Sequence, residues 1–166
     1  MHGVPVRNGT VPPVKRFLAV FAVVANLLLL DAVAKELAIG YLKGARPATV
    51  IPGVFDLAYV ENRGCAWGMF QGQVWPLAAF GLVALAFLIW KRKSVFGTGR
   101  VAAVAECLLY AGIVGNLIDR LFRGCVVDFL DFHWGARHFP CFNFADTYIC
   151  VAAGLLILCS LVRRSS

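Results

Sequence analysis

Four long apolar runs constrain the fold of this chain more than any other feature of its sequence. They extend over residues 17–39, 74–90, 101–118 and 147–162. A helix needs about 20 mostly apolar residues to cross a lipid bilayer, and the shorter runs reach that length when their polar flanks lie at the interface. We therefore expect four transmembrane helices.

The composition supports this interpretation. Hydrophobic residues make up 60% of the chain and charged residues 15%, whereas an ordinary soluble domain is about half apolar and about a quarter charged. A water-soluble fold is excluded because too few polar side chains remain to cover its surface. A disordered chain is excluded because it would be poor in apolar residues. We expect a single integral-membrane domain over residues 1–166, with a flexible tail at 1–14.

The lysines and arginines predict the orientation of the chain in the membrane. Nine of them lie in the two terminal segments and in the connection between the second and third apolar runs, and these segments contain no acid. Short segments rich in cations stay in the cytoplasm, so we expect cytoplasmic termini and outer segments at about 40–73 and 119–146. Eight of the nine acids lie at or beyond the outer helix ends. The nine cations are Arg7, Lys15, Arg16, Lys91, Arg92, Lys93, Arg100, Arg163 and Arg164.

Both outer segments contain β-strand signals. Residues 50–60 are rich in β-branched and aromatic side chains around Pro52-Gly53, a pattern typical of a short hairpin or sheet. Residues 124–130 form a brief strand-like stretch that begins with a glycine. The expected fold is an all-α membrane bundle of four transmembrane helices with a small extracytoplasmic β-rich cradle or lid.

Several polar residues lie within the apolar helices, near their outer ends. Inserting a carboxylate into hydrocarbon costs about 3 kcal/mol, so such a group usually has a partner or faces a cavity. Asp31 and Lys35 are four residues apart on one helix face and suit an ion pair. Asn116, Asp119 and Arg120 also share one face. We expect both sets at the outer membrane boundary, either as structural contacts or as parts of a site.

Paired carboxylates are the strongest chemical signal in the sequence. Asn143 and Asp146 begin the last apolar run, where either could simply cap the helix, and Asp128 lies on the strand between the last two helices. Two aspartates at a boundary of low dielectric constant hold one proton between them. One can then activate water while the other supports the developing oxyanion of a peptide bond. From the residues alone, Asp119 and Asp128 both remain candidates to pair with Asp146.

Other catalytic classes lack their motifs. The sequence contains no H-E-x-x-H, no glycine-rich phosphate loop and no G-x-S-x-G, so we expect no metal and no cofactor. The six cysteines show no paired metal-ligand spacing. A disulfide between Cys125 and Cys141 stays open, as does the oxidation state of Cys65. The net positive charge is attributed to contact with anionic lipid headgroups and not with nucleic acid.

Five motifs, in register along the four apolar runs, resemble those of the bacterial lipoprotein signal peptidases, also called signal peptidase II. The resemblance implies a membrane aspartic endopeptidase that removes the signal peptide of a prolipoprotein immediately upstream of a diacylglyceryl-modified cysteine. The motifs are Asp31 with Lys35, Glu61-Asn62-Arg63-Gly64-Cys65-Ala66-Trp67-Gly68, residues 112–120, Val126-Val127-Asp128-Phe129, and Phe142-Asn143-Phe144-Ala145-Asp146.

The resemblance also implies roles for individual residues. Asp128 and Asp146 are the implied catalytic pair. Asp119 is the runner-up carboxylate or a structural ion-pair partner, because adjacent Arg120 favours its ionised form, whereas the apolar neighbours of Asp128 favour a proton on that carboxyl. The implied enzyme uses no cofactor and acts as a monomer, with prolipoprotein and membrane lipid as its partners. It lies in the bacterial cytoplasmic (inner) membrane with its site facing outward. The residues matched to substrate binding or to support of the pair are Asp31, Lys35, Asn62, Gly64, Asn116, Arg120 and Asn143.

Two other classes of function compete with this interpretation. A small transporter or channel subunit would place ionisable groups across the whole membrane depth, whereas the acids gather toward one face, with Glu106 as the exception. A structural assembly factor would tolerate conservative replacement of both proposed catalytic aspartates. The chain departs from the family pattern at Ala32, Cys65 and Trp67, which concerns fine substrate contacts and leaves the carboxylates intact.

Overall fold

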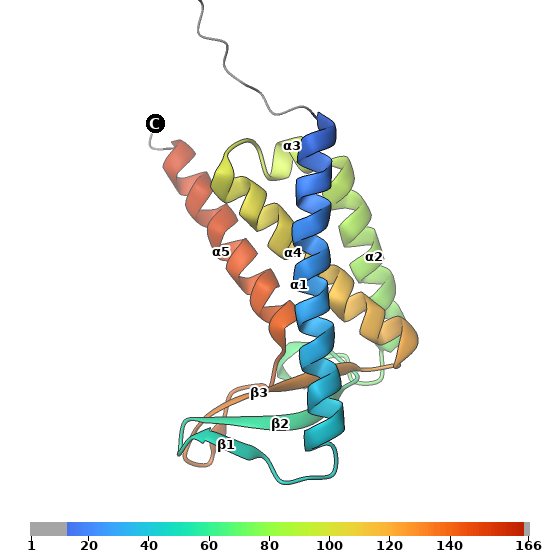
Figure 1. Cartoon of the computed structure of the whole chain (residues 1–166), viewed down its shortest axis with the longest axis vertical. Coiled ribbons are helices and arrows are strands. Elements are labelled where there is room, and N and C mark those ends of the chain that lie inside the picture. The colour runs from blue at the N-terminus through green and yellow to red at the C-terminus, as the bar shows by residue number, and fades with distance from the viewer. Residues whose placement is uncertain (1–12, 165–166) are drawn as a thin grey trace, which may run out of the picture.

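Long helices stand side by side above a small sheet (Figure 1). The structure is a computed structural model that describes residues 13–164. Residues 1–12 of the tail expected at 1–14 therefore lie outside the described residues. Both the start of α1 and the end of α5 lie at the end of the molecule opposite the sheet. The helices are α1 (Pro13–Leu42), α2 (Val74–Trp90), α3 (Arg92–Val95), α4 (Arg100–Phe122) and α5 (Phe144–Arg164).

Three of the described helices are long and apolar enough to cross a membrane: Val14–Leu42, Arg100–Phe122 and Phe144–Val162. The fourth, α2, is apolar but has 17 residues. The expectation of membrane helices with a small sheet is therefore confirmed at this coarser level. The expected helix ends at 39 and 118 were too early, because α1 and α4 continue to Leu42 and Phe122.

The length of α1 explains how it meets the sheet. Its 30 residues correspond to about 45 Å of helix, whereas the hydrocarbon core of a bilayer is about 30 Å thick. The helix α1 is therefore longer than a bilayer crossing requires. In its last turns, Ala38 packs with Val127 and Phe129 of the sheet in a small apolar cluster, and the ring of Phe129 contacts the ring of Phe144 at the start of α5.

The sheet joins the two outer segments. Its four antiparallel strands follow the order β1 (Ala48–Ile51), β2 (Phe55–Asn62), β3 (Val126–Trp134) and β4 (Arg137–His138). The turn between β1 and β2 contains Gly53 with φ of 75°, a conformation that glycine adopts without steric cost. The hairpin expected at 50–60 and the strand expected at 124–130 thus form one sheet, and β3 continues to Trp134. Val60 of β2 pairs with Asp128 of β3.

The central helix of the bundle is α4, which packs against α1, α2 and α5. Two glycines allow neighbouring groups to approach α4 closely, Gly112 on its α5 side and Gly115 between Asp31 of α1 and Ala145 of α5. A Cβ added at Gly112 would lie 2.5 Å from the carbonyl oxygen of Ala145, and one at Gly115 would lie 2.8 Å from Oδ2 of Asp31. Glycine at these positions therefore lets the backbones approach as small residues do in membrane bundles.

The faces directed away from the bundle are apolar. Large side chains such as Leu29 of α1, Val83 of α2 and Ile157 of α5 are mostly exposed, as expected for helices surrounded by lipid. All six cysteines are free thiols. The disulfide between Cys125 and Cys141 that the sequence left open is not formed in this structure.

Replacing Gly112 with alanine is expected to destabilise the contact between α4 and α5. The new Cβ would overlap the Ala145 carbonyl and Cγ1 of Ile149, and overpacking of this kind costs about 1–3 kcal/mol. The melting temperature of the purified protein in detergent should fall. The matched control is Gly154→Ala in α5, where a Cβ meets no atom within 4 Å; its melting temperature should stay equal or rise slightly. Equal melting temperatures for the two variants would contradict the close packing.

Candidate active site

The candidate catalytic aspartates are brought together by the junction between β3 and α5. Asp128 is the third residue of β3, and Asp146 lies in the first turn of α5. Phe142, just before α5, pairs with Leu130 of β3 and accepts a hydrogen bond from the Phe129 amide at 3.0 Å. The strand thus fixes the start of the helix, and both carboxylates lie on one continuous stretch of chain.

Asn143 connects the two carboxylates. Its Nδ2 donates to Oδ1 of Asp128 at 2.7 Å, and its Oδ1 accepts the Asp146 amide at 2.9 Å. The Asn143 amide in turn donates to Oδ2 of Asp146 at 3.3 Å. These reciprocal contacts form a capping box at the start of α5. The capping role that the sequence allowed for both residues is therefore present, and it occurs together with the contact to Asp128.

The remaining oxygens of the two carboxylates also accept hydrogen bonds from amides. Oδ2 of Asp128 accepts from Nδ2 of Asn62 at 3.0 Å, and Oδ1 of Asp146 accepts from Nδ2 of Asn116 at 2.7 Å. The side chain of Asn62 is oriented by the Gly64 amide, which donates to its Oδ1 at 2.9 Å. Each aspartate thus has neutral donors and no direct cation among the described residues.

The electrostatics separate Asp128 from an ordinary carboxylate. Burial and the neighbouring charge of Asp146 raise the pKa of Asp128 from 3.8 to about 7, against the hydrogen bonds from Asn62 and Asn143, which lower it. Asp128 is 1% exposed. Near neutral pH it can therefore hold a proton beside the second carboxylate, as the sequence analysis expected of such a pair.

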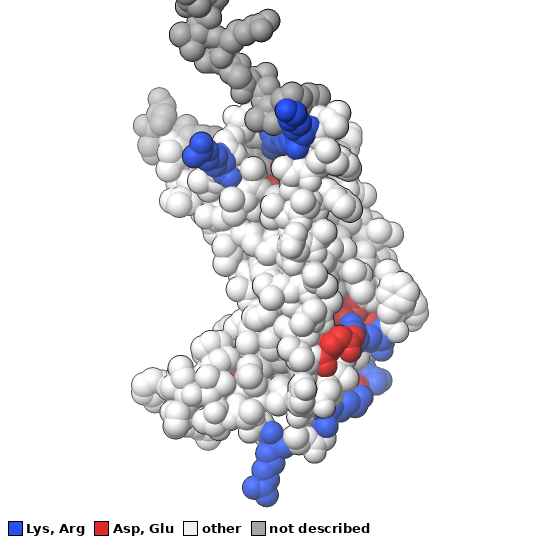
Figure 2. All heavy atoms as spheres, viewed as in Figure 1, with Lys and Arg blue, Asp and Glu red and all other residues white. Residues whose placement is uncertain are grey.

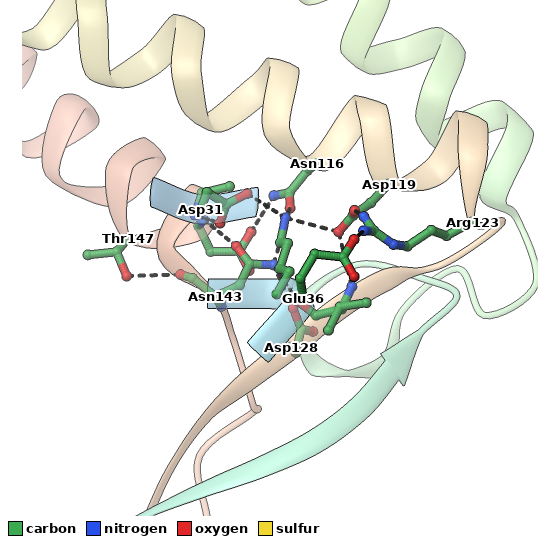
Figure 3. A network of polar contacts seen from close by, with 12 residues as sticks. Asp31, Glu36, Asn116, Asp119, Arg123, Asp128, Asn143 and Thr147 are labelled. Atoms are coloured by element: carbon green, nitrogen blue, oxygen red, sulfur yellow. Dashed lines mark hydrogen bonds and ion pairs between the residues drawn. The ribbon is translucent and has the colours of Figure 1, made fainter. Parts of the chain in front are cut away.

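Beside the pair lies a buried ion-pair network centred on Lys35, and Figure 3 labels its members Asp31, Asp119 and Arg123. Nζ of Lys35 lies 2.7 Å from Oδ2 of Asp31 and 2.9 Å from Oδ2 of Asp119. It also donates to Oδ1 of Asn116 at 3.4 Å. Asp119 forms a further ion pair with Arg123. The predicted pair of Asp31 and Lys35 is present, and it extends to a second carboxylate.

This network also holds the backbone next to each candidate catalytic residue. Oδ1 of Asp31 accepts the amide of Ala145 at 2.9 Å, one residue before Asp146. Oδ2 of Asp119 accepts the amide of Val127 at 3.2 Å, one residue before Asp128. Asp119 therefore has two cations and a backbone amide as partners. In this arrangement it is an ion-pair partner, and Asp128 is the carboxylate linked to Asp146.

An apolar groove of about 970 Å³ opens beside Asp146, between α2, α4 and α5. Asp146, Asn116 and Arg120 line it together with apolar side chains such as Leu77 and Ile113. Asp128 does not line the groove and is connected to it through Asn143 and Asn116. The groove can therefore hold an apolar segment whose polar end lies against Asp146.

The segment after β2 forms one edge of this groove. Nη2 of Arg120 donates to the carbonyl of Gly64 at 3.2 Å, and Cys65 lines the groove. Trp67 and Phe70 have φ of 62° and 57°, in the left-handed region that side chains other than glycine rarely adopt. The Trp67 ring makes an edge contact with Phe139 at 5.4 Å between centroids. Of the three positions that depart from the family pattern, Cys65 lines the groove, Trp67 follows it by two residues on the same segment, and Ala32 on α1 is not among the lining residues.

Some residues of the site escaped the sequence analysis. Arg123 bridges Asp119 and Glu36, and the α2 wall of the groove includes Phe80. Arg123 follows Asp119 by four residues, so helical spacing could have indicated the pair. The groove wall gave no signal, because an apolar residue facing a groove and one facing lipid look alike in sequence. No group of three or more metal-ligating side chains is arranged to hold a metal among residues 13–164.

Comparisons with known proteins show which sequences this chain resembles. Residues 23–162 match the family model for signal peptidase (SPase) II. The chain is 36% identical over 146 residues to a lipoprotein signal peptidase of Syntrophotalea carbinolica, covering 86% of this chain and 91% of the relative. It is 39% identical over 147 residues to a lipoprotein signal peptidase of Shewanella loihica, covering 86% and 85%.

Solved structures show the same fold. A bacterial membrane enzyme determined by the in meso method at 2.3 Å resolution is 28% identical with a TM-score of 0.75, covering 89% of this chain and 90% of that chain. A second one, determined at 1.9 Å resolution, is also 28% identical and has a TM-score of 0.72, covering 86% and 92%. The match to the family model and the identity to its relatives extend over most of the sequence, and this chain therefore belongs to the signal peptidase II family of peptidases.

Proposed function

We propose that the protein removes the signal peptide from diacylglyceryl-modified prolipoproteins, immediately upstream of the lipidated cysteine. Asp128 and Asp146 are the proposed catalytic pair, acting with one water molecule and no cofactor. The observation that carries the proposal is the link between a buried aspartate of pKa about 7 and a second aspartate that lines an apolar groove. The names of the curated relatives support the substrate class.

The proposed reaction divides the work between the two carboxylates. Asp146, ionised, takes a proton from water as the water oxygen attacks the scissile carbonyl carbon. Asp128, protonated, gives its proton to the carbonyl oxygen, so that no full negative charge develops on it. Asp146 then protonates the amide nitrogen as the carbon–nitrogen bond breaks, and the hydroxyl proton of the intermediate returns to Asp128. Both carboxylates end the cycle in their starting protonation states.

The groove and the ion-pair network give the other site residues their proposed roles. Asn62, Asn116 and Asn143 orient the carboxylates by hydrogen bonds. Gly64 and Arg120 hold the edge of the groove against α4. Asp31, Lys35 and Asp119 fix the backbone on which the pair lies. The signal helix would occupy the groove, with the lipid chains of the substrate in the surrounding bilayer.

The proposed topology is a single domain with four transmembrane helices and both termini in the cytoplasm. Figure 2 shows lysines and arginines at the end where α1 begins, a belt without visible charge, and a mixed set of charges near the sheet. The cationic end suits the cytoplasm. The site would then face the outside of the bacterial cytoplasmic membrane. We propose that the active form is a monomer.

Conservative replacement of either proposed catalytic aspartate should abolish cleavage. Asp128→Asn and Asp146→Asn each remove a carboxyl that must transfer a proton, and loss of such a group lowers rates by at least about a hundredfold. The purified variants would be incubated in detergent with a lipid-modified prolipoprotein, and cleavage followed by gel shift. Circular dichroism would confirm that they remain folded. Asp119→Asn is the informative comparison, since it should lower stability more than it lowers the rate of the folded protein.

Full cleavage by Asp128→Asn or Asp146→Asn would refute the assigned pair. Full cleavage by both would support the assembly-factor alternative instead. Absence of cleavage by the folded parent protein with a matched substrate would refute the peptidase reaction proposed for this chain.

The rate of cleavage should fall as the pH rises above about 7, because the raised pKa of Asp128 means that its proton is present below that pH and lost above it. Well above the pKa, kcat/KM should drop about tenfold per pH unit. The profile would be measured between pH 5 and pH 9 on about half-unit steps. Asp131→Asn on the same strand is the control and should leave the alkaline limb in place. A rate that stays level to pH 9 would be inconsistent with Asp128 as the protonated member.

A further inference from the structure

A second groove lies between α1 and α4, at the end of the molecule opposite the candidate active site. Its volume is about 400 Å³. Ala19 of α1 and Ala103 of α4 are small side chains that leave the hollow, and apolar residues such as Val23 and Cys107 line it. Arg16 is the one charged residue among those that line this groove. The catalytic proposal does not use any of these residues.

The length of the groove matches one leaflet of a bilayer. Along α1 it extends from Arg16 to Leu27, which is about 16 Å of helix at 1.5 Å per residue. Half of a bilayer's hydrocarbon core is about 15 Å thick. An acyl chain that starts at the level of Arg16 would therefore reach the middle of the bilayer where the groove ends. A helix that crosses the membrane would need a groove about twice as long.

Arg16 belongs to a cluster with surplus positive charge. Its Nη2 lies 3.1 Å from Oε2 of Glu106, and Arg92 forms an ion pair with the same carboxylate. Glu106 is 1% exposed, and it is the only acid at this end of the described chain. One carboxylate thus pairs with two guanidinium groups. The exposed Lys15 and Lys93 lie on the same elements and have no acidic partner among residues 13–164.

The guanidinium of Arg16 also has unused donors. Its single hydrogen-bond partner among residues 13–164 is Glu106, and its buried Nε has no acceptor there. The side chain is 34% exposed, so it is open to the layer in which lipid headgroups lie. Guanidinium groups bind phosphate through several N–H donors at once, and basic pockets between transmembrane helices bind anionic headgroups.

The geometry points to a binding site for one anionic phospholipid, with its phosphate on Arg16 and an acyl chain in the groove between α1 and α4. The apolar lining of the groove would contact the acyl chain, and the Arg16 guanidinium would contact the phosphate of the headgroup. The proposal depends on the proposed topology only in naming the leaflet as cytoplasmic. Lipid binding is measured separately from cleavage, so failure of one does not decide the other.

The test is lipid retention by the delipidated protein. Phosphatidylglycerol and phosphatidylcholine with identical acyl chains would be added in competition, and bound lipid would be counted by native mass spectrometry. Phosphatidylglycerol should be retained about fivefold over phosphatidylcholine, because its phosphate carries a net negative charge beside Arg16 whereas the choline group neutralises the phosphate of phosphatidylcholine. It should also raise the melting temperature, whereas inorganic phosphate should not.

Three variants separate the headgroup contact from the groove. Arg16→Gln should abolish the preference for phosphatidylglycerol, and Ala19→Leu, which fills the groove, should reduce retention of both lipids. Lys93→Gln removes the same charge from the same end of the molecule outside the groove, and should keep the parent preference.

Equal effects of Arg16→Gln and Lys93→Gln would overturn the site in favour of a diffuse cationic surface. Unchanged lipid retention by Ala19→Leu would refute the binding of an acyl chain in the groove. This measurement tests the proposal even if Arg16→Gln fails to fold. Stabilisation by inorganic phosphate equal to that by phosphatidylglycerol would indicate a simple anion site and would also refute the proposal.

Discussion

A single buried ammonium group, that of Lys35, holds together the part of the fold on which the site depends. It lies between Asp31 and Asp119 and all three side chains are almost completely buried. At low dielectric constant, leaving a buried carboxylate without its partner costs about 3–5 kcal/mol of folding stability. Loss of any one of the three charged groups would therefore destabilise the other two. Because the two carboxylates also accept the amides of Ala145 and Val127, the ion pairs fix the backbone beside both candidate catalytic residues.

Partners, and not depth alone, distinguish the aspartates of this region. Asp119 and Asp128 are both 1% exposed. Asp119 has Lys35 and Arg123 as partners, whereas Asp128 accepts hydrogen bonds from two amide side chains. Neutral donors compensate burial less than cations do, which explains why the pKa of Asp128 rises to about 7. The sequence placed both carboxylates at the boundary but could not assign their partners.

What could be predicted from the sequence depended on local physical requirements. A chain segment in hydrocarbon must form its backbone hydrogen bonds within itself, so the apolar runs predicted helices. The spacing of Asp31 and Lys35 predicted their ion pair. The ends of α1 and α4 were missed because contacts with the sheet extend them. The pairing of Val60 with Asp128 joins strands far apart in the sequence, and nothing local specifies that register. The choice of Asp128 over Asp119 came from the family resemblance, with modest physical support from Arg120 beside Asp119 and from the apolar neighbours of Asp128.

The packing of α2 has a mechanical consequence. This helix rests on α4 among the long helices, and it forms one wall of the large groove, whereas both aspartates lie on the stretch that links β3 to α5. Displacement of α2 away from α4 would widen the groove without stretching the hydrogen bonds through Asn143. A displacement of α2 would therefore change the width of the groove while the two candidate catalytic aspartates keep their spacing.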